Sequence, residues 1–139
     1  MLTAEVMAWI EKEHLPAPGA LGIFCASAGG WSAGDSGVLG LPLIGIATPA
    51  DSDAPPHPEV SNTPYFSKAD FNDPLVLPIR SNDVMARFPP TLVITSTRDV
   101  ALSLALNTHT RLTQLGVDAH SYRTSLTRSL TKVTFMSAY

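Results

Sequence analysis

Residues 88–103 constrain the fold of this chain more than any other stretch. Two prolines, Pro89 and Pro90, set an extended approach and prevent a helix from continuing into the stretch. Residues 91–97 are β-branched and apolar, short enough for one strand and continuous enough for a strand buried on both faces. Asp99 follows at the carboxyl end of that strand, and a helical period begins at once. This order of strand, acid and helix is the layout in which open α/β sheets display functional groups.

The stretch after Asp99 predicts a second α/β step. Its apolar residues recur at helical spacing, and Gly116 is placed to end the helix. Residues 117–122 then alternate as a strand should. The apolar side of the predicted helix consists of Leu102, Ala105, Leu106, Leu112 and Leu115.

The first part of the chain predicts a helix followed by another buried strand. Residues 2–14 have helical periodicity, and residues 16–19 contain two prolines and a glycine that end it. Residues 20–25 form a short, wholly apolar run, as expected of a buried parallel strand reached by a crossover connection. The helical face that we expect to be buried consists of Leu2, Val6, Trp9 and Ile10.

The middle of the chain predicts little regular structure. Residues 26–40 are rich in Gly, Ser and Asp, and residues 48–64 contain five prolines. Residues 65–80 carry aromatic and apolar side chains between turn residues, so we expect this segment to dock on the core. Ser81 is placed to cap a single helical turn that runs through Ala86.

Composition excludes several classes of function. A chain of 139 residues is one domain or a piece of one, and it can bury roughly two-thirds of its unfolded surface. The net charge of −3, with scattered Lys and Arg, argues against nucleic-acid binding. A single cysteine, Cys25, gives neither a disulfide framework nor a thiolate metal cage, and we expect no cofactor. No apolar run approaches 18 residues and no leader is evident, so we expect a soluble cytoplasmic protein without a membrane span.

Ser27 is a candidate nucleophile because it follows a predicted buried strand. A nucleophile elbow needs small residues two before and two after its serine, where the backbone is crowded. Gly29 fits this requirement and Cys25 fits it in part. The elbow must also launch a helix, but residues 31–37 have internal glycines and no apolar period. A serine in a loop at a strand end is therefore the better-supported interpretation.

Asp99 and the four histidines have both chemical and structural interpretations. Asp99 could accept a hydrogen bond from a catalytic histidine, or it could cap the helix that follows, and its position alone favours neither role. His109 falls on the apolar side of its predicted helix, as a core or interface histidine would. His120 lies on a predicted strand and could face either way. His14 and His57 lie in segments where prolines interrupt regular secondary structure. No pair of histidines has the spacing of metal ligands.

Several segments together resemble the α/β-hydrolase esterases of the hormone-sensitive-lipase-like group. The block from Ala86 to Ser103, with its double proline, strand and Thr97-Arg98-Asp99, is the most specific of them. The likeness implies an α/β fold that is a partial α/β-hydrolase, with a mostly parallel sheet and flanking helices. It also implies carboxylic ester hydrolysis by a Ser, His and Asp triad in which Asp99 is the acid. The other segments that carry the likeness are 15–20, 34–36, 65–66, 72–78 and 115–119.

The resemblance also defines what this chain lacks. It covers roughly residues 2–120 of a single domain of residues 1–139, and leaves 121–139 as an atypical tail. In the family, the helix that corresponds to residues 2–14 is launched by the nucleophile elbow, so the nucleophile and the oxyanion segment would lie upstream of Met1. The family's catalytic histidine would fall near Ser129, but no histidine follows His120. The resemblance therefore implies an incomplete fragment with little or no activity alone.

Two other functions stay open at the level of sequence. One is a complete small serine esterase that uses Ser27 with His120 or His109 as its base, acting on a small ester. The other is a non-catalytic interaction module. A half-sheet has open strand edges and uncovered apolar faces, which favour formation of a homodimer.

Overall fold

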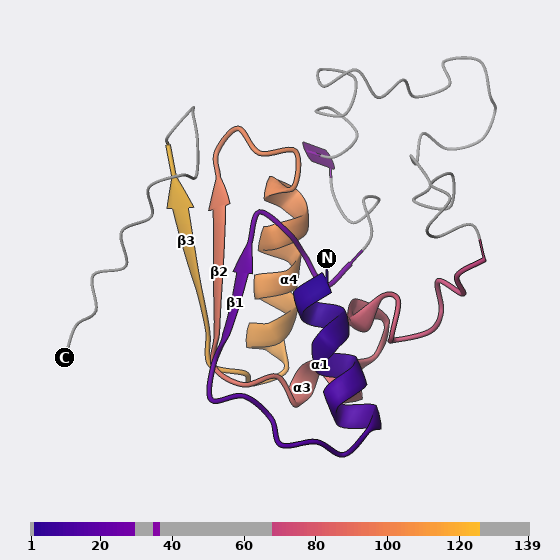
Figure 1. The fold of residues 1–139 in the computed structure, drawn as a ribbon. Helices are drawn as coiled ribbons and strands as arrows, with labels where there is room; N and C mark the ends of the chain where they lie inside the picture. The colour runs from indigo at the N-terminus through magenta and orange to yellow at the C-terminus, as the bar shows by residue number, and fades with distance from the viewer. Residues whose placement is uncertain (1, 30–34, 37–67, 126–139) are drawn as a thin grey trace.

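The computed structural model describes residues 2–29, 35–36 and 68–125 (Figure 1). Its centre is a three-stranded parallel sheet in the order β1-β2-β3. The strands are β1 (Leu21–Phe24), β2 (Thr91–Ser96) and β3 (Ala119–Thr124). The helices are α1 (Leu2–Lys12), α3 (Asn82–Ala86) and α4 (Leu102–Gln114), with a short 3₁₀ turn, η3 (Pro78–Arg80). The α/β architecture with a parallel sheet is the one that the sequence predicted.

The three strands begin at the same level. Leu21 pairs with Thr91, and Thr91 pairs with Ala119 on the other side. Because the ladder is parallel and in register, all three carboxyl ends lie at one edge of the sheet. This edge, which we call the carboxyl edge, is where Asp99 follows β2.

One face of the sheet carries the core. The helices α1, α3 and α4 lie together on this side of the sheet (Figure 1). Side chains from alternate positions of the strands, such as Ile23 and Val93, belong to the hydrophobic core on this face. Burying an aliphatic side chain of this size contributes about 1.5–3 kcal/mol, so this single layer of contacts is the main stabilising feature. The core residues are Ala4, Met7, Leu21, Ile23, Ala28, Met85, Phe88, Val93, Ala105 and Leu112.

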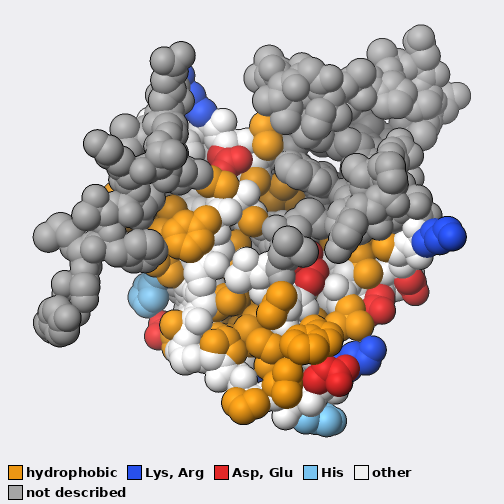
Figure 2. Space-filling model, viewed as in Figure 1, with side chains coloured by type: hydrophobic (Ala, Val, Ile, Leu, Met, Phe, Trp, Pro, Cys, Tyr) orange, Lys and Arg blue, Asp and Glu red, His pale blue; other side chains and the backbone are white. Residues whose placement is uncertain are grey.

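The opposite face is not covered by any described helix. Phe24, Ile94 and Tyr122 share one rung of the ladder and point to this side. Ile94 is only 8% exposed because it lies between its two neighbours, but Tyr122 is 61% exposed and Leu92 is also exposed. The prediction that residues 91–97 are buried on both faces is therefore wrong at Leu92, and the predicted buried strand at residues 20–25 has Phe24 exposed on this face. Figure 2 shows hydrophobic side chains at the surface over the sheet and over α1.

The buried face of α1 differs from the predicted one. Ala4, Met7 and Ala8 are buried, whereas Val6 and Trp9 are 47% and 49% exposed. Both sets have helical spacing, so periodicity alone does not choose between them. The two alanines allow the helix to approach the sheet closely, and the flexible Met7 side chain fills the remaining space.

The ends of α3 and α4 follow the sequence signals. The Ser81 hydroxyl accepts a hydrogen bond from the backbone N–H of Val84 at 3.3 Å, as the predicted cap requires. Gly116 has a φ of +80°, a conformation that glycine adopts without strain, and it follows the end of α4. On α4, Ala105 and Leu112 are buried as predicted.

The apolar stripe of α4 is rotated relative to the prediction. Leu104 and Thr108 are buried, whereas Leu102 and Leu106 are half-buried. Thr108 is tolerated there because its hydroxyl donates to the carbonyl of Leu104 and accepts the N–H of Ala28, each at 3.0 Å.

The described part of the middle segment docks on the core as predicted. Leu77 and Pro78 are buried, and the N–H of Ile79 donates to the carbonyl of Ala28 at 3.0 Å. The predictions for residues 48–64, and for the tail beyond Ser125, lie outside the described residues.

Replacing Glu5 with glutamine should stabilise the fold at neutral pH. One carboxylate oxygen of Glu5 is buried without a hydrogen-bond partner among the described residues. Burial also raises the pKa of Glu5 above its ordinary 4.5. The stability tied to the protonated form is present below pH 4.5 and is lost as the pH rises through the raised pKa. We therefore expect Glu5→Gln to raise the melting temperature modestly at pH 7 and to lose that advantage at pH 4.

Melting curves recorded at both pH values test this prediction. Glu13→Gln, which changes an exposed carboxylate just after the same helix, serves as the control and should show no such pH-dependent gain. Equal gains for Glu5→Gln at pH 4 and pH 7 would contradict the prediction.

Candidate active site

Asp99 lies just beyond the carboxyl end of β2, immediately before α4. Its backbone N–H donates to the carbonyl of Ser96 at 3.1 Å, which turns the chain out of the strand. The Asp99 Oδ1 atom accepts the N–H of Ala101 at 2.9 Å. Ala101 is the residue immediately before α4, so the carboxylate orders the chain just before the helix. The structural role of Asp99 therefore uses one of its two oxygens.

The other oxygen of Asp99 faces residues at the ends of β1 and β2. The hydroxyl of the buried Thr95 donates to Oδ2 over a long 3.4 Å. Cys25 follows β1 and is half-buried. Burial and the neighbouring Asp99 carboxylate together raise the pKa of the Cys25 thiol to about 12. The thiol is therefore protonated at neutral pH and is not a thiolate nucleophile.

A second set of hydrogen bonds ties a distant segment to the start of α4. The Ser36 hydroxyl accepts the N–H of Ser103 at 2.8 Å and donates to the carbonyl of Val100 at 2.9 Å. The Ser103 hydroxyl in turn accepts the N–H of Ser36 and donates to Asp35. This last bond holds the pKa of Asp35 below its ordinary value. Ser36 therefore satisfies a backbone donor in the first turn of α4 from 67 residues away.

Ser27 is buried in the loop that follows β1. Its hydroxyl donates to the carbonyl of Gly29 at 2.6 Å and accepts the N–H of the same residue at 3.2 Å. Both contacts are local, so the side chain stabilises its own loop. The geometry matches the interpretation of Ser27 as a loop serine at a strand end.

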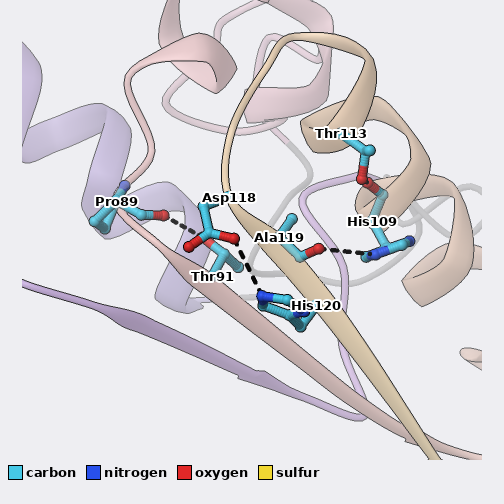
Figure 3. A network of polar contacts seen from close by, with 7 residues as sticks. All are labelled: Pro89, Thr91, His109, Thr113, Asp118, Ala119 and His120. Carbon is cyan, nitrogen blue, oxygen red and sulfur yellow. Dashed lines mark hydrogen bonds and ion pairs between the residues drawn. The ribbon is translucent and has the colours of Figure 1, made fainter.

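Figure 3 shows His109 and His120 close to Thr91 and Ala119, where β2 and β3 begin, whereas Asp99 follows the other end of β2. The Nε2 atom of His109 lies 3.2 Å from the carbonyl of Ala119, and the Nε2 atom of His120 lies 3.1 Å from an Asp118 carboxylate oxygen. His120 pairs with Leu92, four residues before the end of β2. At the strand rise this separation is about 13 Å. The structure therefore does not bring Ser27 or Asp99 together with His109 or His120.

Other features of the described residues lie away from this edge. No group of three His, Cys, Asp or Glu side chains within 2–29, 35–36 and 68–125 could hold a metal ion. None of the helices in these ranges is long and apolar enough to cross a membrane. A cavity of about 400 Å³ lies between the end of α1, the turn at Asp73 and α3. Two of its charged lining residues, Glu11 and Arg87, pair with each other.

Comparison with protein families gives the chain its classification. A family model described as alpha/beta hydrolase fold matches residues 50–126, which is more than half of the chain. The chain belongs to the α/β hydrolase fold family. Within this α/β hydrolase, the matched region contains β2, Asp99, α4 and β3, so the family assignment rests on the part of the molecule that carries the candidate site.

Solved structures similar to this α/β hydrolase are esterases. An esterase named E25 is 30% identical, with a TM-score of 0.60 over 87% of this chain and 35% of its own. Carboxyl esterase 2 from the mycorrhizal fungus Tuber melanosporum and EstE5, in a crystal soaked with ethyl alcohol, are each 18% identical. Their TM-scores are 0.60 and 0.62 over 86% and 87% of this chain and 38% of theirs, which shows a shared fold. This α/β hydrolase spans 35–38% of the length of these esterases. The curated proteins gave no match.

The thiol of Cys25 should react slowly with iodoacetamide. A pKa of about 12 in place of the ordinary 9.0 lowers the thiolate fraction at pH 8 by about a thousandfold. Because the chain has one cysteine, the alkylation rate of the folded protein measures Cys25 alone. We expect a rate about a thousandfold below that of the urea-unfolded chain. Asp99→Asn should increase it, by less than full exposure does, because burial is the largest cause of the raised pKa.

The unfolded chain is the internal control for this measurement, since it carries the same thiol without burial or the Asp99 charge. Equal rates for the folded and unfolded chains at pH 8 would contradict the prediction. An alkylation rate that Asp99→Asn leaves unchanged would contradict the contribution of the carboxylate.

Proposed function

We propose that this chain supplies the acid of a serine-dependent carboxylic ester hydrolase. The observation that carries the proposal is the position of Asp99, held at the carboxyl edge between β2 and α4 with one oxygen facing away from its own turn. The carboxyl edge of a parallel sheet is where α/β folds collect reacting groups. The 30% identical esterase E25 supports ester hydrolysis as the reaction class.

In such a mechanism the acid acts through a histidine. A carboxylate that accepts one imidazole N–H fixes the tautomer of the ring and stabilises the imidazolium that forms when the ring takes a proton from the serine. Asp99 is proposed for this role, with a small carboxylic ester as the substrate. The serine then attacks the ester carbonyl, and water releases the acyl group in a second step.

We propose that the chain alone has little or no hydrolytic activity. Ser27 donates its proton to a backbone carbonyl, and the described histidines near the sheet lie at its amino end. Among the described residues, neither His109 nor His120 lies at the carboxyl edge to serve as the base through which such an acid acts, and this supports the proposed inactivity. On composition alone we also propose a cytoplasmic location.

The first test is hydrolysis of p-nitrophenyl acetate together with labelling by a fluorophosphonate probe. We expect hydrolysis at the background rate, no labelled serine after peptide mapping, and no change on Asp99→Asn. Ser27→Ala is the matched control, because it removes the one serine that sequence pattern nominated as a nucleophile.

Hydrolysis well above background that Ser27→Ala abolishes would instead support the complete small esterase. Hydrolysis that Asp99→Asn abolishes would keep Asp99 as the acid and contradict the proposed inactivity of the isolated chain.

A second candidate function, self-association, is favoured by the uncovered sheet face. Phe24, Leu92 and Tyr122 form an exposed apolar row on that face, and β3 ends the described sheet with little of its surface buried. Such surfaces favour pairing with a second copy of the chain.

Self-association predicts a molar mass that rises toward that of a dimer as concentration increases. Leu92→Ser should shift light-scattering masses toward the monomer, because it removes an apolar side chain from the row. Val6→Ser changes an exposed apolar residue on α1, away from this face, and should leave the mass unchanged. A constant monomer mass for the unmodified chain across the accessible concentrations would rule out self-association.

A further inference from the structure

The peptide group that joins Val100 to Ala101 is held from both of its sides. Its N–H, on Ala101, donates to Asp99 Oδ1 at 2.9 Å. Its carbonyl, on Val100, accepts the hydroxyl of Ser36 at 2.9 Å. This peptide group is trans, so it is planar and its C=O and N–H point in opposite directions. Ser36 and Asp99 therefore hold the two ends of one rigid unit.

The Ser36 hydroxyl is itself oriented by a hydrogen bond from α4. It accepts the N–H of Ser103 at 2.8 Å, which leaves its single proton for the carbonyl of Val100. The resulting chain of hydrogen bonds runs from the Ser103 N–H through the Ser36 hydroxyl and the peptide group to Asp99 Oδ1. All of its donors point the same way, and hydrogen bonds arranged in this manner polarise and strengthen one another.

Ser36 adds a tertiary restraint to a turn that has only local ones. The N–H of Leu102 donates to the backbone carbonyl of Asp99 at 3.0 Å, which closes the turn within the chain. No side chain caps α4 at Ala101, the residue that precedes the helix. Ser36 lies 64 residues before Val100 in the sequence, so its hydroxyl ties this turn to a separate segment.

The two oxygens of the Asp99 carboxylate are held unequally. Oδ1 accepts the Ala101 N–H at 2.9 Å, whereas Oδ2 is held by the Thr95 hydroxyl over a longer 3.4 Å. Because the carboxylate is planar, a fixed Oδ1 also determines the direction of Oδ2. Each oxygen of an ionised carboxylate offers about two acceptor positions, so Oδ2 keeps capacity for one further donor.

We propose that Ser36 is a positioning residue for Asp99 and that it acts through the Val100–Ala101 peptide group. Its hydroxyl fixes the plane of this group and strengthens the group's N–H as a donor, which holds Oδ1 and directs Oδ2 toward an incoming donor such as an imidazole N–H. The catalytic value of this arrangement rests on the proposed role of Asp99 as the acid, whereas the hydrogen-bond chain does not.

Nuclear magnetic resonance of the full chain at pH 7 tests the proposal. The two readouts are the Ala101 amide proton and the Asp99 carboxyl carbon, which report the two sides of one hydrogen bond. Ser36→Ala removes the hydroxyl, so we expect the Ala101 proton to move upfield as its hydrogen bond weakens, and the Asp99 carbon signal to move with it. Ser36→Cys keeps the shape of the side chain with a weaker donor, and should move both signals in the same directions by less.

Ser103→Ala is the matched control. The Ser103 hydroxyl accepts the N–H of Ser36 at 3.0 Å and donates to Asp35, so it also makes two hydrogen bonds between the same segments. Neither of these bonds involves the peptide group that holds Asp99. We therefore expect Ser103→Ala to move the Ala101 proton and the Asp99 carbon less than Ser36→Ala does.

Two results would overturn the positioning role. One is a pair of signals that both Ser36 variants leave unmoved, and Ser36→Cys supplies this test alone if Ser36→Ala does not fold. The other is a move in Ser103→Ala as large as that in the Ser36 variants, which would indicate a purely structural contact between the segments. Hydrolysis assays bear only on the proposed function, so its failure is distinguishable from failure of the positioning role.

Discussion

The in-register pairing of β2 with both of its neighbours is the constraint on which the rest of the structure depends. Thr91 pairs with Leu21 on one side and Ala119 on the other, and every later rung follows from that level. The register decides which side chains enter the core, because alternate residues point to opposite faces. It also brings the chain segments that follow β1 and β2 to one edge, where Cys25, Thr95 and Asp99 meet.

A core built on one face has consequences for the residues that surround it. The helices α1, α3 and α4 cover the face that carries Ile23 and Val93, and the described residues leave the other face to water. Strands of a parallel sheet are usually enclosed on both faces. The apolar sequences of β1 and β2 are typical of strands that are covered on both faces, but the described residues cover them on one face only.

The sequence predicted the elements better than their contacts. Pro89, Pro90 and the β-branched run that follows determine β2 locally, and Ser81 and Gly116 mark helix ends through their own backbone chemistry. The buried face of α1 depended on which side chains fit against the sheet, and periodicity does not contain that information. The same holds for Thr108, whose burial depends on a donor that the loop at Ala28 supplies.

The sequence predicted Asp99 as the residue of the candidate site, but it did not predict which residues surround Asp99. A carboxylate after a buried strand is visible in the sequence, whereas its neighbours come from segments separated by dozens of residues. The sequence analysis considered Cys25 and residues 34–36 for other reasons, and did not predict that Cys25 lies near Asp99 or that Ser36 hydrogen-bonds Ser103, because both depend on tertiary structure. The adjacency of β1 and β2 was the missing information, and the catalytic role of Asp99 stays a prediction.

The two strand pairings join residues at different separations along the chain, and this difference bears on the order in which the sheet folds. Thr91 and Ala119 are 28 positions apart, whereas Leu21 and Thr91 are 70 positions apart. Closing the longer loop costs about 0.8 kcal/mol more chain entropy. We therefore expect the unit β2-α4-β3 to form first and β1 to add to it afterwards. In that order, Asp99 belongs to the part that forms first, and Cys25 joins it with β1.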